Sequence, residues 1–198
     1  MNNEIKNYVK ELYGLHFNKL KNIGLDNPKV LICFSGIPGS GKTYLAKKIE
    51  EMYGGLRINN DEIRAIIKKI VPQDDNFKEK SQNILENYVF SIISSELKNG
   101  LIILDSGIDR RYLKVKEVSD KLGYKIFIIK IEIEEVELKN RIGKRSVEDQ
   151  EHFKTEYGRW KEEFMTFNKS VKANIIIKSG NLSDRKRLFL ELDRFLSF

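Results

Sequence analysis

Cysteine, proline and tryptophan are scarce in this chain of 198 residues, which contains one cysteine, three prolines and one tryptophan. The single cysteine, Cys33, cannot form a disulfide within the chain, and its place in an apolar run predicts a buried structural thiol. Long hydrophobic runs are also absent, because no stretch approaches the ~20 apolar residues that span a bilayer. The first residues lack the basic-then-apolar order of a signal peptide. We therefore expect a cytoplasmic protein that has no membrane partner.

Basic residues outnumber acidic ones, since 36 lysines and arginines against 29 aspartates and glutamates give a formal net charge of +7. This balance suits an anionic partner, although lysine-rich, solvated helix faces would produce the same charge. With 40% hydrophobic residues and no linker, repeat or low-complexity tract, the chain is long enough for one core. We expect a single domain over residues 1–198, and its oligomeric state stays open.

Apolar patterns alternate between two periods along the chain. Helical spacing over residues 5–23 predicts an amphipathic helix within an N-terminal extension, residues 1–28. Continuous apolar runs then predict buried strands over 30–34, 101–104, 126–131 and 175–177, with a short strand over 56–58. Helical patterns separate them, over 61–70, 77–97, 110–122, 134–142, 148–167 and 183–196. This alternation predicts the α/β class, with a parallel sheet covered by helices on both faces.

The first predicted strand runs directly into a glycine-rich loop of the pattern G-x-x-x-x-G-K-T. Glycines allow the backbone to curl around phosphate oxygens with its N–H groups pointing inward. The lysine of this pattern can follow the transferring phosphate, and the threonine hydroxyl can bind Mg²⁺. We therefore expect ATP or GTP to bind through Gly36, Pro38, Gly39, Ser40, Gly41, Lys42, Thr43 and Tyr44.

Asp61 follows the short strand 56–58 and opens the next helix, for which Asn60 is the expected N-cap. Ligands of parallel α/β sheets bind beyond the carboxyl ends of the strands, so Asp61 is a candidate general base for an acceptor hydroxyl. Arg64, three residues on, could hold an anionic group of the acceptor or pair with Asp61 itself. The alternative is an ordinary acidic first turn that favours the helix dipole.

Asp105 ends the strand 101–104 and meets the same sheet edge, where it could hold a Mg²⁺-bound water. Its alternative is a turn-forming aspartate. Asp109, four residues on, is expected to cap the following helix.

Charge is concentrated in a stretch without a clear apolar strand, about residues 141–156, which predicts a surface flap, or lid, followed by a helix. Arg141 and Arg145 are four residues apart, a spacing that places two guanidinium groups on one helix face. Arginines there can stabilise the charge of a transferring phosphate. A solvated basic helix end is the alternative. Trp160 and Tyr157 are expected to pack under the flap rather than stack on a base.

The segments GIPGSGKT, INNDEIR, LIILDSGIDRR and ELKNRIGKR, in this order, resemble the kinase domain of bacteriophage-type 5′-polynucleotide kinases and the zeta-toxin-like kinases related to it. The resemblance covers about residues 29–180. It implies a three-layer P-loop kinase fold with an arginine-bearing lid, and ATP and Mg²⁺ as cofactors. Gly107 departs from the pattern, because the phage enzyme has an amide-bearing residue there.

The same resemblance implies roles for individual residues by their position in the motifs. Asp61 matches the general base, Arg64 the residue that engages the acceptor phosphate, and Asp105 a later active-site aspartate. Arg145 and Arg141 match lid arginines on the ATP side. It also implies the 5′-hydroxyl of a polynucleotide as acceptor. A small-molecule kinase and a nucleotide-binding regulatory ATPase remain as alternatives.

Overall fold

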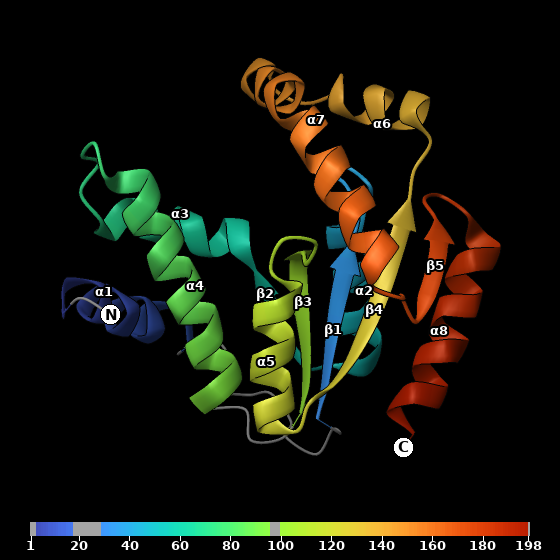
Figure 1. Cartoon of the computed structure of the whole chain (residues 1–198), viewed down its shortest axis with the longest axis horizontal. Coiled ribbons are helices and arrows are strands. Elements are labelled where there is room, and N and C mark those ends of the chain that lie inside the picture. The colour runs from blue at the N-terminus through green and yellow to red at the C-terminus, as the bar shows by residue number, and fades with distance from the viewer. Residues whose placement is uncertain (1–2, 18–28, 96–99, 198) are drawn as a thin grey trace.

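One parallel sheet lies at the centre of the computed structural model, which describes residues 3–17, 29–95 and 100–197. Its strand order is β2-β3-β1-β4-β5. All neighbouring strands run parallel, so their carboxyl ends meet at one edge, the upper edge in Figure 1. The strands are β1 (Val30–Ser35), β2 (Leu56–Asn59), β3 (Leu101–Gly107), β4 (Lys125–Glu132) and β5 (Ile175–Lys178). The predicted α/β class with a parallel sheet is confirmed.

Helices cover both faces of the sheet. Their bounds are α1 (Asn3–Phe17), α2 (Lys42–Tyr53), α3 (Asn60–Ile70), α4 (Phe77–Ser95), α5 (Tyr112–Leu122), α6 (Glu135–Ile142), α7 (Val147–Ser170) and α8 (Leu182–Leu196). Each predicted helix is present, with ends shifted by a few residues. None of the helices in the described ranges is long and apolar enough to cross a membrane.

Two apolar clusters form the core, one on each face of the sheet. Strand side chains alternate between the faces, so Leu31 and Cys33 join the cluster beneath α3, α4 and α5, whereas Ile32 and Phe34 join the cluster beneath α2 and α8. All six residues of β1 are buried, as expected for a strand with helices on both sides. Burial raises the pKa of the Cys33 thiol well above its ordinary range, in agreement with the predicted structural role.

The N-terminal helix α1 packs against α3 and α4 rather than directly on the sheet. Its apolar stripe, formed by Ile5, Val9 and Leu12, is buried in the larger of the two clusters. The prediction extended this helix to residue 23, and the part beyond residue 17 lies outside the described residues.

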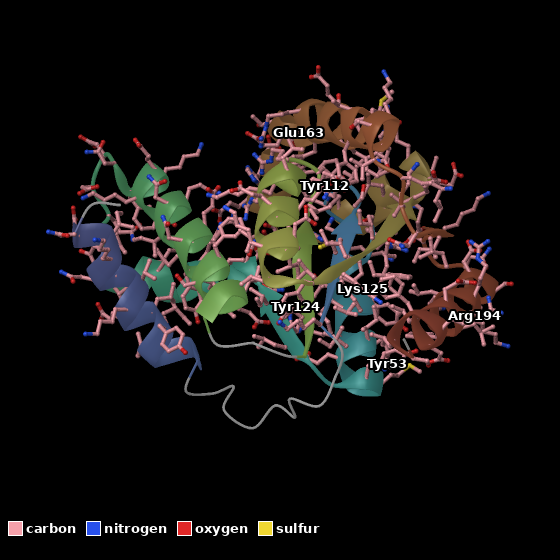
Figure 2. All side chains as sticks on the ribbon, turned by 60° about the horizontal axis from the view of Figure 1, so that its bottom comes forward. Tyr53, Tyr112, Tyr124, Lys125, Glu163 and Arg194 are labelled. Atoms are coloured by element: carbon pink, nitrogen blue, oxygen red, sulfur yellow. The ribbon has the colours of Figure 1, made fainter. Side chains whose placement is uncertain are left out.

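Helices α6 and α7 rise above the carboxyl edge of the sheet (Figure 1). The last turns of α7 return to the body of the protein, where Phe167 is buried and packs edge to face on Tyr112 of α5, with ring centroids 5.5 Å apart. On the same helix Glu163 forms an ion pair with Arg110 at 3.2 Å (Figure 2 labels Glu163 and Tyr112). The lid is therefore a helix–turn–helix anchored at its far end, and its second helix begins inside the predicted 141–156 flap.

Candidate active site

The glycine-rich loop joins β1 to α2 at the carboxyl edge of the sheet. Gly39 has a φ of 93°, a backbone conformation that L side chains rarely adopt. A Cβ atom at Gly39 would also lie 2.8 Å from Cδ1 of Leu138, because α6 packs directly on the loop. The loop therefore needs glycine both for its curled backbone and for the close approach of the lid.

Lys42 points back into the loop, where its Nζ donates hydrogen bonds to the carbonyl oxygens of Gly36 and Ile37 at 2.7 and 3.0 Å. No carboxylate of the described residues lies within ion-pair distance of this ammonium. Burial lowers the pKa of Lys42 to about 8, against the opposing charges of Asp109, Asp105 and Asp61. A partly buried cation without an ion-pair partner in the described residues fits the predicted phosphate site.

Ser40, inside the same loop, also has a polar side-chain atom that no described residue satisfies. Its Oγ is buried and accepts or donates no hydrogen bond in the described structure. Buried hydroxyl groups are normally hydrogen-bonded. The donors and the curled backbone of this loop therefore fit a bound phosphate chain, such as that of ATP.

Thr43 and Asp105 meet as the predicted metal site requires. The hydroxyl of Thr43 donates to Oδ1 of Asp105 at 2.9 Å, and the Asp105 side chain is 1% exposed. In the described ranges no three His, Cys, Asp or Glu side chains gather as a metal site. Mg²⁺ in phosphate-transfer sites uses one or two protein oxygens together with waters and phosphates. The Thr43–Asp105 pair fits such a magnesium site.

Two residues of β2 hold Asp105 from the other side, and the sequence reading missed both roles. Oδ2 of Asp105 accepts hydrogen bonds from Nη1 of Arg57 at 2.7 Å and from Nδ2 of Asn59 at 2.6 Å. Arg57 also pairs with Glu50 and Glu62. A charged residue between two apolar ones in a short strand was the available signal, but its partner Asp105 lies 48 residues away. These bonds fix the carboxylate that faces Thr43.

Asp61 and Arg64 occupy the first turns of α3. Nη1 of Arg64 donates to Oδ1 of Asp61 at 3.1 Å, and the Asp61 side chain is 90% exposed at the sheet edge. The prediction of Asn60 as the N-cap is wrong. Asn59 takes that place, because its side chain accepts from the backbone N–H groups of Asp61 and Glu62 while Asn60 already has a helical position.

Asp109 does not cap α5, contrary to the prediction. The N-cap of that helix is Arg111, without a side-chain capping bond. Asp109 instead turns toward the phosphate loop, where its carboxylate accepts from the Ser35 hydroxyl at 2.6 Å and from the Gly36 N–H at 3.4 Å. Asn168 of α7 donates to the same hydroxyl at 3.3 Å. The start of the loop is thus tied to the turn after β3 and to the lid helix α7.

The two lid arginines do not share a helix face as predicted, because α6 ends at Ile142 and Arg145 lies in the turn that follows. Ser146 begins the next helix by accepting from the backbone N–H of Asp149. Arg141 donates to Gly39 O, Ser40 O and Ser179 Oγ at 3.0 to 3.4 Å, whereas Arg145 is exposed and its charge contributes to the lowered pKa of Lys42. Arg141 thus contacts the phosphate loop directly, whereas Arg145 acts on the loop lysine only through its charge.

The remaining predicted residues lie around the loop. Tyr44 stands beside α8, where its hydroxyl accepts from Arg185 at 2.9 Å. Trp160 and Tyr157 of α7 pack with the buried Phe153 in a small cluster that includes Leu138 of α6, so the predicted packing role is confirmed. A cleft of about 490 Å³ opens beside the loop at the carboxyl ends of β4 and β5, lined by Ile37, Phe164, Ser179 and Asn181 among others.

Together, a phosphate loop at the carboxyl edge of a β2-β3-β1-β4-β5 sheet and a helical lid above that edge define the P-loop kinase fold. A family model described as an AAA domain matches residues 31–169, more than half of the chain. The protein belongs to this AAA domain family. No curated protein matches the chain.

Solved structures with the same fold share little sequence with this chain. A structure from the PezAT chromosomal toxin-antitoxin system of Streptococcus pneumoniae is 13% identical with a TM-score of 0.59, covering 96% of this chain and 94% of that one. The tunicamycin resistance protein of Deinococcus radiodurans is 13% identical with a TM-score of 0.56, covering 84% and 95%. Shikimate kinase from Bacteroides thetaiotaomicron is 16% identical with a TM-score of 0.54, covering 84% and 96%. These likenesses confirm the P-loop kinase fold and do not single out the polynucleotide kinase or zeta-toxin group.

Proposed function

We propose that the protein is an ATP-dependent phosphotransferase that moves the γ-phosphate to a hydroxyl group of a small acceptor. The observation that carries this proposal is the meeting of three functions at one sheet edge. They are the cation of Lys42, which is in no ion pair in the described residues, the Thr43–Asp105 oxygen pair, and the carboxylate of Asp61, whose charge acts on Lys42. A nucleotide-binding switch would need the first two but no acceptor base.

A small acceptor replaces the polynucleotide as the preferred substrate. Proteins of similar fold include a shikimate kinase and, with a TM-score of 0.51 and 16% identity, a sugar kinase from Janibacter sp. HTCC2649. The 5′-end of a polynucleotide is the second candidate. The net charge of +7 and the open position of Asp61 and Arg64 favour it.

The residues divide the work of transfer among them. ATP, when bound, supplies the phosphoryl group, and Mg²⁺ would be held by Thr43 directly and by Asp105. Lys42 neutralises charge on the phosphates, and Arg145 adds a second cation from the lid. Asp61 orients the acceptor hydroxyl and takes its proton as the new O–P bond forms and the bond to ADP breaks.

The proposal is tested by transfer of labelled γ-phosphate from ATP with Mg²⁺ to a panel of hydroxyl acceptors. The panel contains sugars, hydroxy acids, nucleosides and a 5′-hydroxyl oligonucleotide. We expect at least one small acceptor to be labelled and Asp61→Asn to reduce the turnover about 10²- to 10⁴-fold, the usual contribution of a general base. The KM for ATP should stay close to that of the wild type.

Asp120→Asn is the matched control, because Asp120 lies at the far end of α5 and pairs with Lys116 there. This variant should transfer phosphate as the wild type does. Labelling of the oligonucleotide alone would move the proposal to the second candidate. ATP hydrolysis that no acceptor changes would instead indicate a regulatory ATPase.

A further inference from the structure

Four basic side chains, those of Arg64, Arg110, Arg111 and Lys114, lie on α3 and around the start of α5, where Arg64 pairs with Asp61. Most of these cations have their own carboxylate. Arg64 pairs with Asp61 at 3.1 Å and Arg110 with Glu163 at 3.2 Å. In the same way, Lys114 pairs with Glu86 at 3.4 Å.

Arg111 is the exception in this group. Its guanidinium forms no ion pair or hydrogen bond with any residue in the described parts of the chain. Burial lowers the pKa of Arg111, and the neighbouring charges of Arg64 and Arg110 lower it further, although the charge of Glu86 opposes them. A half-buried arginine without a paired anion is costly unless a ligand supplies one.

The surroundings of Arg111 form a small hollow of about 20 Å³. Its polar lining consists of Arg111, Glu86, Asn60 and Ser106, and Val89 and Phe90 are among its apolar lining. Asn60 precedes Asp61 in α3, and Arg64, which pairs with Asp61, is linked through Gln82 to Glu86 of the lining, so the hollow lies near Asp61. This volume is little more than a water molecule needs, so only a small end group fits without movement.

The backbone holds Arg111 rigidly at this place. The N–H of Arg111 donates to Ile108 O at 2.8 Å, and the N–H of Ile108 donates to Phe34 O in β1 at 2.8 Å. The turn after β3 is thereby fixed to the sheet. On the opposite wall, Gln82 joins Arg64 to Glu86 through bonds of 3.5 and 2.6 Å.

We propose that Arg111 binds an anionic group of the phosphate acceptor, a carboxylate or a phosphate, at this hollow, with Arg64 as a neighbouring cation outside the lining. The proposal rests on the proposed phosphotransfer, because it places the anion beside the hydroxyl that Asp61 would deprotonate. Arginine suits the site because its planar guanidinium can donate two parallel hydrogen bonds to either anion. The acceptor is therefore a hydroxyl compound that carries negative charge near the reacting oxygen.

Three probes with a shared glycerol skeleton test the site: glycerol, glycerate and glycerol 3-phosphate. They are titrated into the protein saturated with Mg²⁺ and a non-hydrolysable ATP analogue, which occupies the phosphate loop. The readout is the set of arginine Nε–Hε signals in ¹H–¹⁵N spectra. We expect an anionic probe, but not glycerol, to shift the Arg111 signal. Glycerate and glycerol 3-phosphate decide between carboxylate and phosphate.

Variants of Arg111 then test whether its side chain binds the anionic probes. Arg111→Gln should weaken the anionic probe roughly tenfold or more, the loss expected for a charged hydrogen bond, and Arg111→Lys should keep part of the affinity. Arg110→Gln is the control, because its neighbouring guanidinium lies outside the hollow and is paired with Glu163. An Arg111 signal that is moved by neither glycerate, glycerol 3-phosphate nor a 5′-hydroxyl dinucleotide, or equal affinity in Arg111→Gln, would overturn the proposal.

Phosphate transfer is measured separately in the same preparations, so that the two proposals fail independently. If anions bind through Arg111 but no acceptor is phosphorylated, the proposed anion site is supported and the proposed kinase activity is rejected. If an acceptor is phosphorylated with the same KM in wild type and Arg111→Gln, the proposed kinase activity is supported and the proposed anion site is rejected. If a 5′-hydroxyl dinucleotide shifts the Arg111 signal and glycerol 3-phosphate does not, the anion is an internucleotide phosphate.

Discussion

At the scale of single residues, Lys42 makes nucleotide affinity depend on pH. The pKa of about 8 means that the free protein loses this charge within the experimentally accessible range. Above pH 8 the affinity for a non-hydrolysable ATP analogue should fall, by at most about tenfold per pH unit. Calorimetric titration from pH 7 to 10 measures this. Lys42→Arg, which stays charged, should bind with a flat profile, and a flat wild-type profile would contradict the assignment.

The free energy of unfolding should change with pH in the opposite direction to the nucleotide affinity. Lys42 binds fewer protons in the folded chain than in the unfolded chain between pH 8 and about 10.4. Its contribution to the free energy of unfolding therefore rises with pH over this window, while the ligand affinity falls. Urea unfolding of wild type and Lys42→Met at pH 7.5 and 9.5 isolates this contribution.

Asp109 is the largest of the charges that oppose the lowering of the Lys42 pKa. Asp109→Asn removes that charge while an oxygen remains to accept from the Ser35 hydroxyl. We expect the pH midpoint of nucleotide affinity to move down. A fall of about half a pKa unit would reduce the affinity at pH 8 about twofold. Asp193→Asn, whose carboxylate pairs with Tyr53 on the far side of the fold, should leave the midpoint unchanged.

Residues within one contiguous motif could be predicted from sequence, whereas residues defined by distant partners could not. The loop, Thr43 and Asp61 follow from local patterns at the end of a strand. The role of Asp109 depends on Ser35, which is 74 residues away, so a helix-capping position was an equally good local interpretation. Arg111 could not be singled out from the sequence, because what distinguishes it is that the neighbouring basic residues Arg64, Arg110 and Lys114 have carboxylate partners.

At the scale of elements, Asn59 links the start of helix α3 to the Asp105 carboxylate of strand β3. Its side chain caps α3 and donates to Asp105. Asn59→Ala should cost about 2 kcal/mol, from one cap and one buried hydrogen bond. It should lower the melting temperature by roughly 4–8 °C and weaken activation by Mg²⁺.

Asn181→Ala is the matched comparison, since Asn181 caps α8 through the N–H of Asp184 but does not contact Asp105. It should cost about 1 kcal/mol and leave the Mg²⁺ dependence unchanged. Thermal unfolding and Mg²⁺ titrations of both variants measure the difference. An equal Mg²⁺ response in the two variants would mean that Asn59 acts only as a cap.

In the lid, the predicted helix boundaries differ from those of the structure. The spacing of Arg141 and Arg145 suggested one continuous helix, yet α6 ends at Ile142. Ser146 with Asp149 three residues on is an N-cap signal that marks the start of α7 in the sequence. The strands and the alternation of the sheet were predictable because buried apolar runs extend over several residues, whereas a helix end depends on a few polar contacts.

At the scale of the whole molecule, the net charge of +7 overstates the number of free basic side chains, because many of them have a carboxylate partner. Many lysines are paired with a carboxylate three or four residues away on their own helix, as in Lys48–Glu51, Lys116–Asp120, Lys121–Glu117, Lys139–Glu135 and Lys154–Glu151. These pairs match the lysine-rich, solvated helix faces that the sequence left as an alternative explanation. Exposed pairs of this kind are neutral at a distance and are screened by salt.

The salt dependence of the acceptor KM therefore separates the two acceptor classes. A polynucleotide held through six to ten phosphate contacts would bind about 10³- to 10⁵-fold more weakly at 200 mM than at 50 mM salt. A small anion held by Arg111, with Arg64 as a neighbouring cation, has one charged contact region, so we expect its KM to rise by less than about tenfold over this range. Steady-state kinetics at four salt concentrations, with ATP saturating, measure the slope. A steep slope would show that the basic side chains act as a polyanion-binding surface, and would restore the polynucleotide as the acceptor.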